Sequence, residues 1–416
     1  MPRPGQNTRW WIAPAIATAI VGVSSIFGQP AVRDALNGRP VTGVHLVLPP
    51  GYVVLSPLNR IFDLICLLSV PQHVALLISV VLLFALWRAL RRSPLLQSLR
   101  NEALAGSALV VIIVVIYGFA IAGPRPMAAI RVDDGDIVRV DFHSHTNVSG
   151  DARRTFSPTR NREWHRAAGY DVSYVTDHRR FRGARAAVAA NPAHAGDGFI
   201  ALMGFEGRIR GVDVVVPGMT AADSSMIGIK QRLHLDTLTS GREPVVIAAI
   251  PVRNIERIDT IAGIDSAYVR AVEIVDGAPR GLLQEQREGA RIREIARQHR
   301  LLLVAGSNSH GWGRTAVAWN LVRVPGWRLL SADSLGAVLE DALRARDSAR
   351  IQVIERLRPF AETNPTLLLG TLPVGLWQML TTLTPTERIA WIAWAWVLVL
   401  AKRSRRYLVI SSRISQ

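Results

Sequence analysis

The chain has 416 residues, of which 49 are Lys or Arg and 32 are Asp or Glu, so its formal net charge is +17. Hydrophobic residues make up 49% of the chain, which excludes a disordered protein because such a composition can bury a core. The single cysteine, Cys66, excludes a small disulfide-stabilised scaffold. A basic and apolar chain fits a nucleic-acid partner or a membrane, and these two classes differ in where the charge lies along the sequence.

Three charge-free apolar runs occupy the first third of the chain, at about residues 10–32, 64–87 and 103–123. Each is long enough to cross a hydrocarbon core, which needs about 20 residues. The first run could be a cleaved signal peptide, but residues 26–30 offer no clear small-residue cleavage site, so we favour an uncleaved anchor. A fourth predicted span covers about residues 384–401. We expect a short interfacial or re-entrant helix before the second span and another before the fourth.

Basic residues flank these runs on alternate sides, which predicts how the chain crosses the membrane. The basic positions are Arg3, Arg9, Arg88, Arg91, Arg92, Arg100 and Lys402 to Arg406. With four spans, the positive-inside rule predicts cytoplasmic N- and C-termini and an extracytoplasmic region between the third and fourth spans. The chain is therefore predicted to be a multi-pass protein of the bacterial cytoplasmic membrane. Its expected divisions are a membrane region at 1–123, a globular domain at 124–360, and a helical C-terminal region at 361–416.

From Ile137 onward, short β-rich segments alternate with polar helical segments. Helices are predicted at 159–168, ending at Gly169, and at 281–299. Repeated β-α units predict a parallel, barrel-like α/β domain, in which chemistry lies at the carboxyl ends of the strands. Strands are predicted at residues 137–142, 172–176, 199–204, 212–216, 245–250, 271–275, 301–305 and 316–322.

Four of these predicted strands end in residues that can bind a metal. His143 and His145 are spaced i, i+2, so their side chains point the same way and can share one ion. A lone His-x-His pair is weak evidence, but three other strand ends also supply His, Asp or Glu. The full candidate set is His143, His145, Asp151, His178, Glu206 and His310.

The segments that carry these residues are DFHSHTNVSGD from Asp141, GYDVSYVTDH ending at His178, GFEG around Glu206, and GSNSHG around His310. In this order they resemble the PHP (polymerase and histidinol phosphatase) family of metal-dependent phosphoesterases. The resemblance implies a distorted seven-stranded, TIM-like β/α barrel, here inserted between transmembrane helices. It also implies a first metal on His143 and His145 with Glu206 as a bridge, and another metal on Asp151, His178 and His310. Such metals are usually zinc, manganese or iron.

Three positions depart from the family pattern. Asn308 stands where the family has an aspartate, so it can coordinate only through a neutral oxygen. Ile250 stands where the family has a histidine and cannot bind a metal. Asp213 aligns with another family histidine and could supply an oxygen. We therefore expect one family metal site to be altered or lost and two divalent metals to remain.

The resemblance implies hydrolysis of a phosphate ester, in which a metal-bound hydroxide attacks phosphorus in line. Arg179, Trp312 and Arg314 are the candidates for contacting the phosphorylated substrate. His165 is expected at the surface, and Glu273 and Asp276 could support the ligands, although we assign them no role.

The expected partners are the lipid bilayer and a phosphorylated small molecule, lipid or glycan, with no nucleic acid as a stable partner. The alternative function is a degenerate PHP barrel that acts as a membrane sensor or scaffold. Asn308 and Ile250 favour that alternative.

Overall fold

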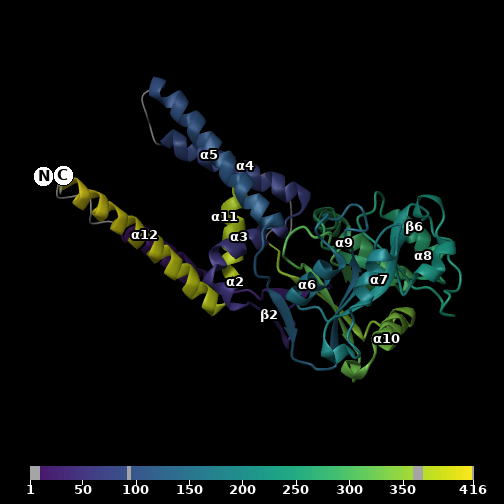
Figure 1. The fold of residues 1–416 in the computed structure, drawn as a ribbon. Coiled ribbons are helices and arrows are strands. Elements are labelled where there is room, and N and C mark those ends of the chain that lie inside the picture. Colours follow the sequence, from purple (N-terminus) through teal and green to yellow (C-terminus); the bar gives the residue numbers. More distant parts are fainter. Residues whose placement is uncertain (1–9, 91–94, 359–368, 415–416) are drawn as a thin grey trace.

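The computed structural model describes residues 10–90, 95–358 and 369–414. Figure 1 shows a curled sheet with surrounding helices on one side and a set of long helices that project away from it. Arg3, Arg9, Arg91 and Arg92, which entered the topology prediction, lie outside the described residues, as does the predicted domain boundary at 360.

Ten strands form one sheet in the order β1–β12–β11–β4–β5–β6–β7–β8–β9–β10, so the globular domain is a mixed α/β structure. All eight predicted strands are present, as β4 to β11. The strands are β1 (Val32–Asp34), β4 (Ile137–Ser144), β5 (Val172–Val175), β6 (Ile200–Ile209), β7 (Val212–Pro217), β8 (Val246–Ala248), β9 (Val269–Asp276), β10 (Leu302–Gly306), β11 (Ala318–Arg323) and β12 (Ile351–Arg356). A separate pair consists of β2 (Val44–Val47) and β3 (Ala129–Val132).

The sheet curls until its last strand, β10, lies against strands near its other end. Ser309, just beyond β10, forms a bridge with Ser144 at the end of β4. The side chain of Asn320 on β11 accepts a hydrogen bond from the backbone amide of Ala305 at 2.8 Å. It also donates one to the backbone carbonyl of Ala305 at 2.7 Å. These contacts bring the carboxyl ends of β4 and β10 together, although the two strands are far apart in the order of the sheet.

The expectation of a parallel, seven-stranded barrel is wrong in strand number and direction. Strands β4, β5 and β6 are parallel, as are β8, β9 and β10, but β7 runs antiparallel to both of its neighbours. The reason is the two-residue turn Arg210–Gly211 between β6 and β7, in which both residues have positive φ, 49° and 84°. A turn this short can join only antiparallel strands. Strands β11, β12 and β1 also pair antiparallel.

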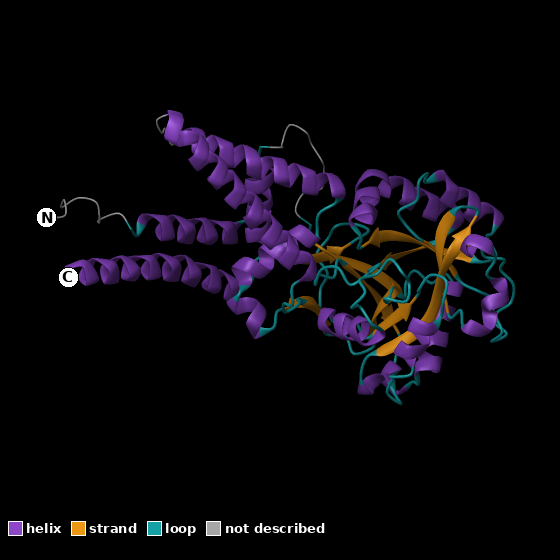
Figure 2. Cartoon of the chain, turned by 45° about the horizontal axis from the view of Figure 1, so that its top comes forward, coloured by secondary structure: helices purple, strands orange, loops and turns teal. Residues whose placement is uncertain are grey.

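Helices surround the sheet (Figure 2). They are α6 (Pro158–Ala168), α7 (Arg182–Val188), α8 (Glu256–Ile264), α9 (Pro279–His299) and α10 (Ala332–Arg344). The two predicted helices correspond to α6 and α9. Helix α6 begins at Ser157, whose hydroxyl accepts the amide of Arg160, and ends at Gly169 in the left-handed region with φ 85°. A Cβ at Gly169 would lie 2.4 Å from the carbonyl oxygen of Ile130, so this turn also requires glycine for space.

The projecting helices form two antiparallel pairs, α1 (Ile12–Ile26) with α12 (Pro385–Ile414) and α4 (Val70–Leu90) with α5 (Leu95–Ala122) (Figure 1). We call the curled sheet and its surrounding helices the barrel. Near the barrel, Arg388 of α12 donates to the carbonyl of Val21 at 2.9 Å. At the far end of the pair, the guanidinium of Arg403 lies 4.8 Å from the centre of the Trp10 ring. In the other pair, the amide of Gly313 in the barrel donates to the carbonyl of Ile121 at 2.8 Å. The carboxyl end of α5 therefore rests on the barrel.

Short helices α2 (Pro50–Val54), α3 (Ser56–Cys66) and α11 (Thr371–Thr381) lie at the base of these pairs. The short helices expected before the second and fourth spans correspond to α3 and α11. Within this base, Arg60 of α3 binds Glu387 of α12 through two hydrogen bonds of 2.6 Å, and both side chains are buried. The ion pair fixes α12 against α3, because separating either partner would leave a buried charge unpaired.

Among the described residues, two helices are long and apolar enough to cross a membrane, Val70–Leu90 and Arg100–Ala122. Only 11% and 6% of the residues in the most apolar stretch of each helix are buried, whereas the core helix of a soluble protein is mostly buried. Helix α1 is apolar but has only 15 residues. The predicted span at 64–87 is misplaced at its start, because Leu64 belongs to α3 and the long helix begins at Val70.

Replacing Gly169 with Ala tests the packing that ends α6. We expect Gly169→Ala to lower the free energy of unfolding by at least about 2 kcal/mol, because the new methyl group meets backbone atoms and the left-handed φ disfavours a side chain. Gly326→Ala is the matched control, since Gly326 also has positive φ but has no heavy atom within 4 Å of the added Cβ. Denaturant unfolding of the full chain in detergent measures both variants, and equal losses would contradict the packing argument.

Candidate metal centre

Histidine and carboxylate side chains from β4, β6 and the loops after β4, β5 and β10 meet inside the curled sheet. His143, His145 and Glu206 form one group of potential ligand atoms that all lie within 4.8 Å of one another. His145, His178 and His310 form a second such group. The two groups share His145, so these five residues, predicted from separate segments of the sequence, are brought into one cluster.

The carboxylate of Glu206 lies at the middle of this cluster. Its Oε2 atom is 3.2 Å from His143 Nε2, 3.1 Å from His145 Nε2 and 3.2 Å from His178 Nε2. Two ligand atoms bound to one ion at about 2.0–2.1 Å in tetrahedral geometry are about 3.3–3.4 Å apart. The observed separations are close to those of atoms that share an ion, and Glu206 lies 3.2 Å from a histidine nitrogen of each group.

Asp151 supplies a second carboxylate at the solvent side of the cluster. Its Oδ2 atom is 3.3 Å from His178 Nε2 and 3.4 Å from His310 Nε2. The Asp151 side chain is 52% exposed, whereas those of His178 and His310 are each 21% exposed. The cluster is therefore buried at His145 and open at Asp151, so a ligand can reach it from this side.

Hydrogen bonds on the outer nitrogens orient two of the histidine rings. Nδ1 of His143 lies 2.8 Å from Oε1 of Glu273, and Nδ1 of His310 lies 2.8 Å from the carbonyl oxygen of Asn308. Because both partners are acceptors, the proton belongs on Nδ1, which leaves the lone pair on Nε2 facing the cluster. This is the arrangement that a metal-binding imidazole needs.

Burial and charge set the protonation of the cluster. Burial lowers the pKa of His145 to about 3, so this ring is neutral at pH 7. Burial opposes ionisation of Glu206, but His143 and His145 outweigh it and hold the pKa of Glu206 well below its usual range. Burial alone would lower the pKa of His143, but Glu273 and Glu206 outweigh it and raise this pKa well above its usual value. A metal that binds His143 must therefore displace the proton on Nε2. An ionised carboxylate beside imidazoles is a donor set that zinc, manganese and iron accept.

His165 is not at the surface, so that expectation is wrong. Its ring is completely buried, and its Nε2 atom lies 2.8 Å from Oδ2 of Asp141. Asp141 also accepts hydrogen bonds from the amide and hydroxyl of Ser307 at 2.9 and 2.5 Å, and from the amide of His143 at 3.2 Å. Asp141 and His165 therefore hold the end of β4 against the loop that carries His310.

Glu273 and Asp276, at the end of β9, form a third group with His143. Glu273 contacts the outer nitrogen of His143, and its other oxygen accepts the amide of Ile250 at 3.0 Å. Glu273 thus positions His143 and lies behind the proposed ligands. Burial, followed by the charge of Glu273, raises the pKa of Asp276, whose carboxylate accepts a hydrogen bond from Asn308 at 2.9 Å.

The three positions that depart from the family pattern have different surroundings. Asn308 donates through Nδ2 to Asp276, while its Oδ1 atom is buried and has no hydrogen-bond partner among the described residues. This uncharged oxygen has a free lone pair with which it can bind a metal. Ile250 is 2% exposed and packs in the core. Asp213 pairs instead with Arg208 on the β6–β7 hairpin and belongs to none of the three groups.

Two hollows open beside the cluster, and Asp151 lines both. One, of about 780 Å³, is lined by His178, Arg179, Arg208 and Lys230 among others. The other, of about 350 Å³, is lined by Asn308, His310 and Trp312 among others. Arg179 and Trp312 therefore line hollows next to the cluster.

Arg314 points elsewhere. It lines a neighbouring hollow that contains none of the candidate ligands, and it donates to the carbonyl of Arg125 at 2.5 Å. The structure therefore does not bring Arg314 to the cluster.

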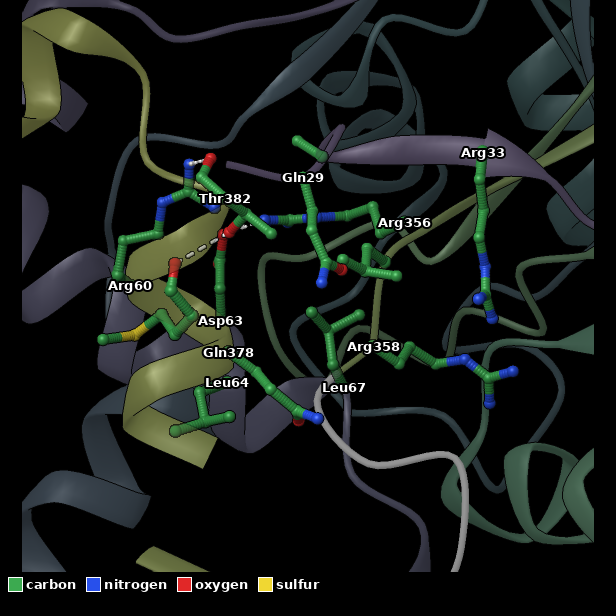
Figure 3. Close-up of a pocket in the computed structure, with 13 residues that line it drawn as sticks. Gln29, Arg33, Arg60, Asp63, Leu64, Leu67, Arg356, Arg358, Gln378 and Thr382 are labelled. Atoms are coloured by element: carbon green, nitrogen blue, oxygen red, sulfur yellow. Dashed lines mark hydrogen bonds and ion pairs between the residues drawn. The ribbon is translucent and has the colours of Figure 1, made fainter. Parts of the chain in front are cut away.

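A separate cavity of about 190 Å³ lies between the barrel and the helices. Its charged groups are already paired, because Arg356 binds Asp63 and Arg60 binds Glu387. Figure 3 shows Arg60 and Arg356 at this cavity with Asp63 between them. None of the candidate metal ligands lines it, so we regard it as part of the junction between the two regions.

No protein-family model and no curated sequence matches the chain. Among solved structures, it is similar to PsfC from Pseudomonas syringae PB-5123, at 14% identity and a TM-score of 0.35, over 59% of this chain and 98% of that chain. A "putative metal-dependent phosphoesterase" from Bifidobacterium adolescentis has 20% identity and a TM-score of 0.29, over 49% and 96% of the two chains. An amidohydrolase from Chromobacterium violaceum, with bound sulfate and no metal, has 15% identity and a TM-score of 0.31, over 52% and 97%. These values are too low to assign an activity.

Elemental analysis of the purified full chain tests the metal centre. We expect the wild type to retain divalent metal and His145→Ala to lose it, because His145 belongs to both ligand groups. Glu273→Gln should weaken metal binding by about 10–100-fold, since it removes the carboxylate that orients His143. His194→Ala is the control, because His194 is exposed and pairs with Asp197 in its own loop. Equal metal content in His145→Ala and His194→Ala would exclude this centre.

Proposed function

We propose that the chain is a membrane-held, metal-dependent phosphoesterase of the PHP type. The observation that carries this proposal is the convergence of His143, His145 and His178 on the ionised carboxylate of Glu206. His310 joins the cluster through His145 and His178. Bound divalent metals would supply Lewis-acid polarisation of a phosphoryl oxygen and activation of water at neutral pH. We expect two such metals, one on each ligand group.

The remaining residues of the site have separable roles in this proposal. Arg179 and Lys230 line the larger hollow, and neither forms an ion pair within the described parts of the chain, so their charges are free for an anionic substrate. Arg208 lies in the same hollow but is held by Asp213. Asp151, half-exposed between the two hollows, is the carboxylate nearest to an entering phosphate and can bind a metal there.

A scaffold without activity remains the alternative function, and Asn308 is the residue on which the two differ. In an active centre, Asn308 Oδ1 would serve as a neutral ligand in place of a carboxylate. In a scaffold, the loss of that charge would leave the metal centre unable to activate water.

The membrane part of the proposal rests on α4 and α5. Their apolar side chains are mostly exposed, which is unfavourable in water and favourable in hydrocarbon. The 23 residues of Arg100–Ala122 span about 34 Å, enough for a hydrocarbon core of about 30 Å. Arg88, Arg100, Lys402 and Arg403 all lie toward the helix ends remote from the barrel, which favours a barrel outside the cytoplasm and termini within it.

Phosphatase assays on the full chain test the proposed activity. We expect the manganese- or zinc-loaded protein to hydrolyse a generic aryl phosphate monoester or diester, and chelation to abolish this. His178→Ala should lower kcat/KM by about 100-fold or more, because loss of a ligand removes several kcal/mol of charge stabilisation. His299→Ala is the control, since His299 pairs with Asp259 away from the cluster.

A full complement of metal without turnover of either ester would contradict the phosphoesterase and favour the scaffold. Equal activities in His178→Ala and His299→Ala would place any measured hydrolysis outside this centre.

Cysteine labelling in a Cys66→Ser background tests the proposed topology, because Cys66, the only native thiol, is partly exposed and lines a hollow. In spheroplasts, a membrane-impermeant maleimide should label Ile264→Cys, which is 59% exposed on the barrel helix α8. It should label Arg100→Cys, at the remote end of α5, only after lysis. Labelling of both positions before lysis would show that the bilayer does not separate them, and the reverse pattern would invert the topology.

A further inference from the structure

The hollow beside His310 differs in character from the one beside Arg179, although both reach Asp151. On the first side, the walls are mainly apolar and include Trp164, Trp312 and Val317. On the other side, the walls carry Arg179, Arg208 and Lys230. The candidate metal centre therefore lies between an apolar surface and a basic one.

The apolar hollow is built jointly by the barrel and the projecting helices. Ile65 and Cys66 come from α3, His73 from the first turn of α4, and Ile121 from the last turn of α5. Within the described ranges, helices α4 and α5 are the two that are long and apolar enough to span a membrane. The hollow thus begins at the ligands of the cluster and ends where those two helices meet the barrel.

Two side chains on this path are apolar and accessible. Trp312 is 55% exposed and lines the hollow, with the guanidinium of Arg153 5.8 Å from its ring centre. Ile121 is 40% exposed at the membrane-proximal end. Exposed apolar side chains beside a polar reaction centre serve a substrate that has both an apolar and a charged part.

We propose that the substrate is a phosphorylated lipid of the bilayer, bound with its phosphate at the metal cluster and its hydrocarbon chain in the hollow that leads to α4 and α5. This inference rests on the proposed phosphoesterase activity and adds its substrate class. The basic hollow receives the headgroup or the free oxygens of the phosphate. A water-soluble sugar phosphate or nucleotide would use the basic hollow and leave the apolar one wet and empty.

Alkyl phosphonates of different chain length test the inference without requiring turnover. The full chain is reconstituted in lipid nanodiscs with manganese, and binding of butylphosphonate and dodecylphosphonate is measured by calorimetry. We expect the wild type to bind the dodecyl compound at least about tenfold more tightly, since each buried methylene adds favourable transfer energy. Trp312→Ala and Ile121→Ser should each lower this dodecyl-to-butyl preference by about threefold or more.

Ile264→Ser is the matched control for Ile121→Ser, because it removes an exposed isoleucine on α8, remote from the hollow. Partition of the dodecyl chain into the nanodisc is common to all variants, so the difference from the control measures the hollow alone. An unchanged preference in both Trp312→Ala and Ile121→Ser would overturn the inference.

Hydrolysis of butyl and dodecyl phosphate, measured in parallel, separates this inference from the proposed function. Turnover of butyl phosphate with no gain from the longer chain would leave a phosphoesterase whose substrate is not a lipid. Variant-sensitive binding of dodecylphosphonate without turnover of either ester would leave a lipid-phosphate binding protein that is not an enzyme.

Discussion

The carboxylate of Asp63 fixes how the helices sit on the barrel. It is 2% exposed and accepts hydrogen bonds from Tyr52 at 2.7 Å, Arg125 at 2.7 Å, Thr315 at 2.7 Å and Arg356 at 2.8 Å. These partners come from α2, the segment after α5, the loop after β10, and β12. A buried carboxylate without these partners would cost several kcal/mol, so the four segments are held together at one point. The loop of Thr315 also carries His310, which places the candidate metal centre near the ends of α4 and α5.

The same need to compensate buried charge shapes the cluster itself. Glu206 is buried and ionised beside three imidazole nitrogens, while Glu273 lies behind His143 as a fixed hydrogen-bond acceptor. The Nε2 atoms of His143 and His145 lie 3.1 Å apart, so their lone pairs need a proton or a cation between them. A divalent ion would satisfy these donors together. Fold stability and metal binding are therefore expected to be linked at this centre.

The sequence predicts the strands and the cluster well because each depends on local pattern. Strands β4 to β11 follow from short apolar runs, and the ligands follow from polar residues at their ends. The antiparallel direction of β7 is not predicted, because it depends on a two-residue turn in which Arg210 has a positive φ, and the sequence does not reveal that angle. The buried pair of His165 and Asp141 escapes it because a lone histidine on a polar helix looks exposed. The one sequence signal for this pair is Asp141, which begins the motif but is not among the candidate metal ligands.

The central claim is that His143, His145, His178, Glu206 and His310 bind metal beside the hollow that leads to α4 and α5. Anomalous diffraction from crystals of the full chain grown with zinc or manganese tests it most directly. The account predicts anomalous peaks about 2.0–2.2 Å from the Nε2 atoms of these histidines and from the Glu206 carboxylate. Ordered side chains in this cluster with no anomalous peak among them, at saturating metal, would contradict it.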